Sequence, residues 1–149
     1  MPKAPPPRGF MRLQWRLHKL IWKLSGARLG RRVDGMPVLR LVTTGHTSGR
    51  PRDVLLWYVD TKTGPVLAGT NAGADHDPAW IMNLRADPSA TMTVEGVTTP
   101  VIAVFLDGEP HAAAWATLVA AHGGYRTYAE VLTRPVPIVR LSSRNGDEV

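Results

Sequence analysis

From residue 36 to residue 143 the sequence consists largely of short apolar runs separated by turn-forming residues, and this pattern restricts the fold more than any other feature. Several runs alternate between apolar and polar residues, which is typical of half-buried strands. The segments DTKTGP and EGVT are typical of tight connections between strands. Strands are expected at about residues 38–44, 53–60, 65–70, 90–95, 98–106 and 136–142.

Three segments are expected to form helices. Residues 10–26 place apolar side chains at spacings of three and four on one face, with Arg and Lys on another, which predicts a basic amphipathic helix. The segment DPAWIMNLRAD predicts a second helix, with Asp77 as N-cap and Pro78 at the first helical position. The Ala-rich segment GEPHAAAWATLVAAHG predicts a third helix, closed by Gly123 and Gly124.

The strands outnumber the helices and are linked mostly by hairpins rather than by regular βαβ units. We therefore expect an α+β fold of about six mostly antiparallel strands, closed into a barrel, with an N-terminal amphipathic helix and two further helices. The 149 residues suffice for one domain. Within it we expect a flexible Pro-rich tail (1–9), the basic helix (10–26), the barrel domain (36–143) and a C-terminal tail (144–149).

The positive charge is concentrated in the first third of the chain. Residues 1–52 contain 12 of the 18 Lys and Arg residues and only one acidic residue. Such a segment favours an anionic partner, such as a phospholipid surface or a polyanionic small molecule. The basic helix could therefore lie on an anionic membrane or pack on the protein's own sheet. It carries no recognised DNA-binding motif, so nucleic acid is not expected.

The chain contains no cysteine, which excludes disulfides, thiol nucleophiles and thiolate metal sites. Its N-terminal apolar residues are interrupted by Arg and Lys, so no secretory signal is expected. No segment has the length of a transmembrane helix. We expect a cytoplasmic protein, with peripheral association at the inner face of the cell membrane as a further option.

The segment VTTGHTSGRPR, residues 42–52, has more hydrogen-bond donors than a simple hairpin turn requires. Two glycines permit positive φ and can expose consecutive backbone N–H groups, which form an anion-binding nest. Thr47 and Ser48 add hydroxyl groups, and Arg50 and Arg52 can bind phosphate oxygens. The turn is therefore a candidate site for a phosphate or carboxylate, although a solvated hairpin is the better explanation of this segment taken alone.

Two further segments carry candidate chemistry. AGTNAGADHDPAWIMNL, residues 68–84, joins a strand end made of small residues to a helix N-terminus, where a flat ligand could approach the backbone. HGGYRTYAEVLTR places Tyr125 and Tyr128 three residues apart, so both could face one pocket. Asp75, His76 and Asp77 do not form a complete metal shell with other residues, and no metal site is expected.

In this order, the three segments resemble the deazaflavin (F420)-dependent nitroreductase family, also called F420-dependent quinone reductases. The resemblance covers residues 12–141. It rests on the T-T-G-x-x-S-G-x-x-R turn, the P-x-W-x-x-N-L helix, and the Tyr-x-x-Tyr segment before a final Pro-Val strand. It implies a split β-barrel related to FMN-binding reductases, and hydride transfer from reduced F420 to a quinone, an enone or a nitroaromatic compound.

The resemblance also implies roles for individual residues. The turn would hold the phosphate and polyglutamyl tail of F420, and Tyr125 and Tyr128 would line or close the substrate side, where either phenol could supply a proton. Family members commonly have basic residues at one or both positions between Gly45 and Ser48, where this chain has His46 and Thr47. The implied cofactor-binding residues are His46, Thr47, Ser48, Arg52, Val54, Leu55, Leu56, Trp57, Ala68, Gly69, Thr70, Asn71, Ala79, Trp80 and Asn83.

Two alternatives remain at this stage. The same fold could serve a non-catalytic protein that binds F420, a flavin, haem or lipid. FMN is the lesser alternative to F420 as cofactor. The expected partner is a small-molecule electron acceptor, and related barrels often form homodimers.

Overall fold

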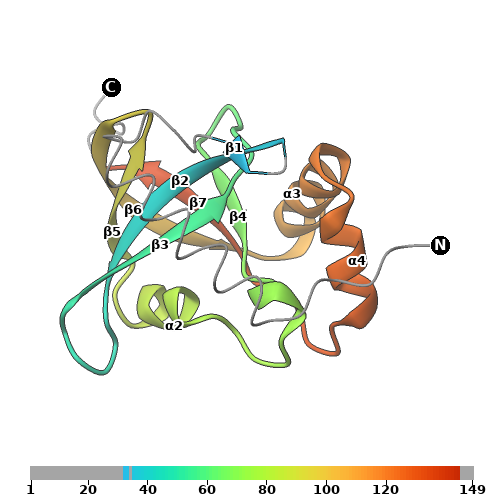
Figure 1. Ribbon diagram of the computed structural model, residues 1–149, viewed down its shortest axis with the longest axis horizontal. Coiled ribbons are helices and arrows are strands. Elements are labelled where there is room, and N and C mark those ends of the chain that lie inside the picture. Colours follow the sequence, from blue (N-terminus) through green and yellow to red (C-terminus); the bar gives the residue numbers. More distant parts are fainter. Residues whose placement is uncertain (1–31, 34, 145–149) are drawn as a thin grey trace.

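The structure is a computed structural model that describes residues 32–33 and 35–144. The expected Pro-rich tail (1–9), the amphipathic helix (10–26) and residues 145–149 of the expected C-terminal tail lie outside the described residues. The remainder forms one curled antiparallel sheet with helices at its edges (Figure 1).

Every strand pairing in the described sheet is antiparallel, as the hairpin pattern predicts. The order along the sheet is β1-β2-β5-β6-β7-β4, and β3 also pairs with β2. Six of these strands correspond to the six that the sequence predicts. The strands are β1 (Arg32–Val33), β2 (Met36–Thr44), β3 (Pro51–Trp57), β4 (Val66–Ala68), β5 (Ser89–Val94), β6 (Val97–Leu106) and β7 (Ile138–Ser143).

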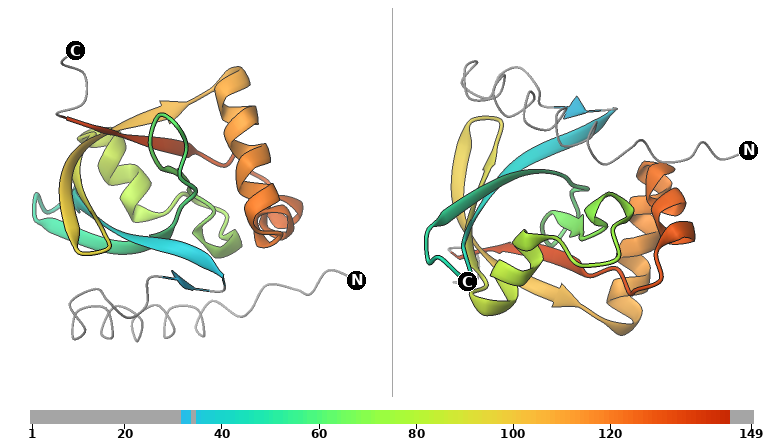
Figure 2. Two further views of the ribbon diagram at one scale, coloured as in Figure 1. Left: turned by 90° about the horizontal axis from the view of Figure 1, so that it is seen from above. Right: turned by 60° about the horizontal axis from the view of Figure 1, so that its bottom comes forward.

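The two ends of the sheet meet, so that the sheet becomes a barrel. β3 pairs with β2 outside this path, and β4 lies at the far end of the path. Val59, just beyond β3, forms an antiparallel bridge with Val66 at the start of β4. The backbone N–H groups of Val59 and Val66 each donate to the carbonyl of the other, at 3.2 and 2.9 Å. The views in Figure 2 show the resulting curl of the strands.

Four short helical elements complete the described chain: η1 (Asn71–Gly73), α2 (Ala79–Ala86), α3 (Gly108–Ala121) and α4 (Gly124–Val131). α2 begins one residue later than predicted, with Pro78 rather than Asp77 as its N-cap, because the Asp77 carboxylate binds Arg85 and Arg134 instead. The prediction of only two helices after the N-terminal one misses α4. Gly123 is the N-cap of α4, with φ −61° and ψ −19°, and Gly124 is its first residue, so the Gly pair begins a new helix.

The apolar side chains form two clusters. The larger fills the barrel and includes Leu39 and Leu41 of β2 together with Trp80, Ile81 and Leu84 of α2. The smaller joins the sheet to α3 and α4 through Leu118 and Tyr125, among others. In Figure 1, α3 and α4 lie together and α2 lies apart from them. The buried face of α2 therefore fixes that helix beside the β2–β3 turn, with Ala79 exposed at its N-terminus.

Candidate cofactor-binding site

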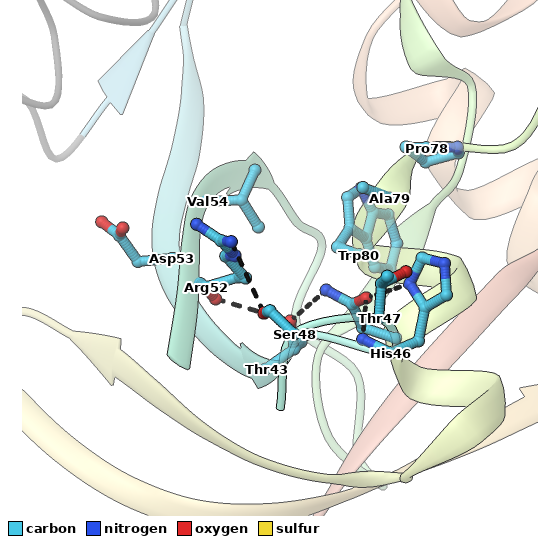
Figure 3. A pocket seen from close by; sticks show the side chains of 12 residues that line it. Thr43, His46, Thr47, Ser48, Arg52, Asp53, Val54, Pro78, Ala79 and Trp80 are labelled. Atoms are coloured by element: carbon cyan, nitrogen blue, oxygen red, sulfur yellow. Dashed lines mark hydrogen bonds between the residues drawn. The ribbon is translucent and has the colours of Figure 1, made fainter. Parts of the chain in front are cut away.

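A pocket of about 580 Å³ opens between the β2–β3 turn, the first residues of β3 and the N-terminus of α2 (Figure 3). This volume lies within the range of about 300–1,000 Å³ that is usual for small-molecule and cofactor sites. The pocket joins segments that are separated by some thirty residues in the chain. It is lined by Thr43, Gly45, His46, Thr47, Ser48, Arg52, Asp53, Val54, Pro78, Ala79, Trp80 and Asn83.

A buried amide attaches the turn to the helix. Asn83 of α2 is only 3% exposed, and its Oδ1 accepts a hydrogen bond from the backbone N–H of His46 at 2.9 Å. Its Nδ2 donates to Oγ1 of Thr43 at 3.0 Å, and the Thr43 hydroxyl in turn donates to the carbonyl of Arg52 at 3.4 Å. One side chain thus links β2, the turn and α2, and it sets the width of the pocket.

The turn itself is held by its own backbone. Gly45 N–H donates to the Arg50 carbonyl and Gly49 N–H donates to the Gly45 carbonyl, both at 2.8 Å. A Cβ atom at position 45 would lie 2.6 Å from Ser48 Oγ, and Gly49 has φ +67°, so both positions favour glycine. Among the described residues, the backbone N–H groups of Thr47 and Ser48 have no protein acceptor, which leaves two adjacent donors for an anion.

Polar side chains extend this donor group. Ser48 Oγ accepts from the backbone N–H of Arg50 at 3.2 Å and from Nη2 of Arg52 at 3.5 Å, which brings the Arg52 guanidinium to the turn. The acidic group in the pocket is Asp53, whose Oδ2 lies 3.4 Å from Nε of Arg40. The turn end of the pocket is therefore rich in hydrogen-bond donors.

The opposite wall is apolar. Val54 faces the pocket from β3, and Pro78, Ala79 and Trp80 face it from the start of α2 (Figure 3). Trp80 is 6% exposed and belongs mainly to the barrel core, so only part of its ring is available to a ligand. The site thus combines donors for an anionic group with an apolar surface for a flat group.

Eight of the fifteen residues proposed from the sequence to bind the cofactor line this pocket: His46, Thr47, Ser48, Arg52, Val54, Ala79, Trp80 and Asn83. The other seven do not. Leu55 is buried, Leu56 packs against the barrel core, and Trp57 and Ala68 pack against the second cluster. Gly69 and Thr70 follow β4, and Asn71 begins η1.

The residues that follow β4 adopt an unusual backbone. Asn71 and Ala72 have φ of 47° and 53°, in the left-handed region that residues other than glycine rarely adopt, and Gly73 has φ 80°. Such conformations cost free energy and persist only where surrounding contacts hold them. Asn71 Nδ2 donates to the carbonyl of His76 at 3.1 Å, which closes part of this loop on itself.

Arg134 supplies most of the remaining support for the loop, a role that no sequence pattern indicates. Its Nε donates to the Ala74 carbonyl and its Nη2 donates to the carbonyls of Gly69 and Thr70, each at 3.1 Å. Its Nη1 donates to Asp77 Oδ1 at 2.7 Å. Most of its acceptors are backbone carbonyls about sixty residues away, and no side-chain pattern predicts such partners.

The two tyrosines proposed as catalytic lie together on α4 but do not line the pocket. Tyr125 is 3% exposed and its ring makes edge-on contacts with Trp57 and Trp115, at 6.0 and 6.2 Å between centroids. Tyr128 is also buried and lies beside η1, close to Gly73. Burial, and to a smaller extent the neighbouring Tyr128, raise the pKa of the Tyr125 phenol above its ordinary value.

The raised pKa of Tyr125 leads to a prediction about alkaline stability. At a pH above about 10 the unfolded chain ionises this phenol, whereas the folded protein keeps it protonated. The free energy of unfolding therefore falls as the pH rises beyond that point, with a slope of about 1.4 kcal/mol per pH unit from this group. We expect Tyr125→Phe to remove this part of the pH dependence.

The measurement is urea unfolding of both proteins at about pH 8 and about pH 11, on either side of the ordinary tyrosine pKa. The wild type should lose about 1 kcal/mol more stability between the two conditions than the variant. Equal losses in the two proteins would contradict the assignment of this pH dependence to Tyr125.

Among the described residues, no three His, Cys, Asp or Glu side chains are grouped so that they could hold a metal ion. No described helix has the length and apolar character needed to cross a membrane.

Comparison with known proteins identifies the family. The family model described as F420H(2)-dependent quinone reductase matches residues 14–143. The chain belongs to the F420H(2)-dependent quinone reductase family. An F420H(2)-dependent quinone reductase of Mycobacterium tuberculosis strain H37Rv is 30% identical over 139 residues, which cover 87% of this chain and 89% of the relative. The resemblance deduced from the three sequence segments is thereby confirmed.

Solved structures agree with this family. A structure described as an F420-H2-dependent reductase (FDR-A) is 26% identical, with a TM-score of 0.66 over 71% of this chain and 94% of its own. Another, described as a domain-swapped dimer, is 25% identical, with a TM-score of 0.68 over 88% and 99% of the two chains. The haem storage protein HutZ of Vibrio cholerae, at 18% identity, shares the fold alone.

These findings confirm the predicted split β-barrel. As a member of the F420H(2)-dependent quinone reductase family, the chain is an F420-dependent reductase, and its cofactor is coenzyme F420 rather than FMN. The non-catalytic alternative is not favoured.

Proposed function

We propose that this chain reduces quinones at the pocket between the β2–β3 turn and α2, using reduced F420 as the electron donor. The supporting observation is the division of this pocket into a donor-rich end and an apolar wall. F420 has the same division, because it joins an anionic tail of one phosphate and several carboxylates to a flat deazaflavin ring. The residues present therefore fit the cofactor of the family.

The turn would hold the cofactor tail. The free backbone N–H groups of Thr47 and Ser48, their hydroxyl groups and the Arg52 guanidinium together match the oxygens of a phosphate. The N-terminus of α2, with the uncharged residues Pro78 and Ala79, adds the positive end of the helix dipole to the same pocket. These groups would bind and orient the cofactor tail, and none of them needs to change charge for the reaction.

The apolar wall would exclude water from the ring. When bound in reduced form, F420 supplies a hydride from C5 of its deazaflavin ring. Val54 and the partly accessible Trp80 offer apolar contact, and Ala79 permits close approach. Positioning and exclusion of water are the main contributions that a protein makes to such cofactor chemistry. A strong side-chain base is not required.

We assign Tyr128 and Tyr125 to the acceptor side of the site, with Tyr128 as the nearer source of a proton. Tyr128 lies beside Gly73 in the loop that follows β4, whose residues 68–71 the family resemblance places next to the ring. A positioned general acid contributes about a hundredfold or more to the rate. Tyr128→Phe should therefore lower kcat at least tenfold with KM for F420 nearly unchanged; an unchanged kcat would indicate that solvent supplies the proton.

The proposed function is tested first by binding. Purified protein should bind F420 with a dissociation constant in the low micromolar range, measured by quenching of the cofactor's fluorescence. A panel of quinones, enones and nitroaromatics should then oxidise reduced F420 faster with the protein than without it. Absence of binding would contradict the proposal, and binding without turnover would favour a storage or carrier role.

Thr47 offers a way to strengthen the proposed tail site. It is exposed on the turn and lines the pocket, at a position where family members often have a basic residue. We expect Thr47→Lys to lower the dissociation constant for F420 about threefold at low salt, the effect of one exposed ion pair. The gain should shrink above about 0.5 M salt because exposed charges are screened. Equal affinity of both proteins at low salt would mean that the tail lies elsewhere.

Two interactions of the whole chain are also proposed. The basic amphipathic pattern of residues 10–26 supports peripheral contact with an anionic membrane at the inner face of the cell membrane, where lipid-soluble quinones are found. Deletion of residues 1–26 should abolish co-sedimentation with anionic vesicles, and unchanged co-sedimentation would contradict the contact.

The similar structure described as a domain-swapped dimer supports a homodimer, which light scattering can test.

A further inference from the structure

The contacts of Asn83 determine how its amide is oriented. A backbone N–H can only donate, so the Asn83 atom that lies 2.9 Å from the His46 nitrogen must be the oxygen, Oδ1. The amide nitrogen then faces the Thr43 hydroxyl, to which it donates at 3.0 Å. Both ends of this buried amide are therefore assigned by the hydrogen bonds that they make.

The orientation of Asn83 fixes the protonation of the His46 ring. Nδ1 of His46 lies 2.6 Å from the same Oδ1 atom. Because Oδ1 is only an acceptor, Nδ1 must carry a hydrogen for this contact to be a hydrogen bond. A neutral His46 is thus held in the Nδ1–H tautomer, and its Nε2 atom keeps a lone pair.

Nε2 is the ring atom that remains for a ligand. His46 is exposed and lines the pocket, and within the described part of the chain no protein group binds its Nε2. With a lone pair on Nε2, the ring offers no hydrogen to an anion in the pocket. With a proton on Nε2, the same atom becomes a charged N–H donor while the bond from Nδ1 to Asn83 stays in place.

The other charged groups around His46 are arginines, which stay positive, or carboxylates that are bound to arginines. Arg50 and Arg52 on the turn and β3 remain positive at all relevant pH values. Asp53 of β3 lies against Arg40. α2 contributes only uncharged side chains to the pocket, and Asp77 before it is held by Arg85 and Arg134. Histidine is the side chain that normally changes charge between about pH 5 and 8.

We infer that Asn83 is a positioning residue that presents Nε2 of His46 to the pocket, and that His46 is a protonation-dependent ligand for the phosphate of the cofactor tail. The affinity for F420 consequently rises as the pH falls through the range in which histidine gains a proton. This inference rests on the proposed function, because it assumes that the tail of F420 lies on the turn.

The test is calorimetric titration at about pH 8 and about pH 5.5, where histidine changes charge and tail carboxylates, with an ordinary pKa of about 4.3, remain ionised. Two ligands are compared: F420, and the deazaflavin riboside that lacks the phosphate and glutamates. The dissociation constant for F420 should fall about fivefold on acidification, the effect of converting one contact into a charged hydrogen bond. The riboside controls for titration of the ring and should not show this extra change.

Two variants locate the effect. His46→Gln replaces the ring with a side chain that does not titrate, and it should remove the pH dependence that is specific to F420. His76→Gln is the matched control, because His76 is an exposed histidine that contacts Asp75 and does not line the pocket. It should leave the pH dependence as in the wild type.

A second measurement needs no cofactor. Nitrogen-15 NMR of the histidine ring at about pH 8 should show His46 protonated on Nδ1, the form that the Asn83 contact requires. A ring protonated on Nε2 would overturn the inference. So would F420 binding that is independent of pH in the wild type, or equally pH-dependent in His46→Gln. If neither ligand binds at either pH, the proposed function fails, and the inference fails with it.

Discussion

Arg134→Met should lower the free energy of unfolding by about 3 kcal/mol, because it removes one partner of a mostly buried ion pair and the donor of several carbonyls. The Arg134 side chain is 13% exposed, and its guanidinium binds Asp77 as well as the carbonyls of Gly69, Thr70 and Ala74. Asp77 keeps its contact with Arg85, at 2.6 Å, so the carboxylate is not left without a cation. Urea unfolding at neutral pH measures the loss.

The same substitution should also weaken F420 binding, because Arg134 holds Asp77, which immediately precedes Pro78 of the pocket wall. Its contacts constrain the left-handed backbone at Asn71 and Ala72, and its bond to Asp77 fixes the residue before Pro78. We expect the dissociation constant to rise about tenfold at a temperature where the variant is fully folded.

Arg126→Met is the matched control. Arg126 lies exposed on α4, and its side chain forms no hydrogen bond or ion pair with the described residues. It should change neither the stability nor the affinity by a measurable amount. A folded Arg134→Met protein that binds F420 as tightly as the wild type would show that this arginine serves stability alone.

Asn83→Ala should remove the hydrogen bonds that join the turn and β2 to α2. It removes the acceptor of the His46 N–H and leaves the buried Thr43 hydroxyl without its donor. Leaving buried polar groups unsatisfied costs about 1–3 kcal/mol, so we expect a loss of about 2 kcal/mol in the free energy of unfolding. We also expect the dissociation constant for F420 to rise about thirtyfold, because the donors of the turn are no longer held opposite the apolar wall.

Thr98→Ala is a suitable control, since it removes a hydrogen bond of 2.8 Å to Thr93 on an exposed part of β5 and β6. It should lower the stability by less than about 0.5 kcal/mol, as is usual for surface substitutions, and should not affect F420 binding. The result that would contradict the role of Asn83 is a variant that loses stability but keeps its affinity for F420.

Most of the fold could be predicted because the barrel strands carry strong local signals. The apolar runs that include Leu39, Leu41, Val101 and Val139 form the core of the barrel, as their burial requires. β1 was not predicted because a strand of two residues is too short to show an alternation of apolar and polar residues. α4 was not predicted because Gly123 is typical of the end of a helix. In the structure it adopts a helical backbone and precedes α4.

The turn could be proposed as a binding site from the sequence because its chemistry is local: the glycines, hydroxyls and arginines lie within a single segment. The role of Asn83 was only partly predictable. The family resemblance marks it as a cofactor contact, but its bonds to His46 and Thr43 depend on how α2 packs against β2. The surroundings of Tyr125 likewise depend on the packing of α3 and α4 against the sheet.

The central claim is that this pocket positions reduced F420 for transfer of its hydride to a quinone. Anaerobic mixing of the protein with reduced F420 and a soluble benzoquinone, followed by the absorbance of the oxidised cofactor, tests it most directly. Oxidation should depend on the protein, should slow when C5 of the cofactor carries deuterium, and should slow further with Asn83→Ala. Binding of reduced F420 without any acceleration of its oxidation would contradict the account.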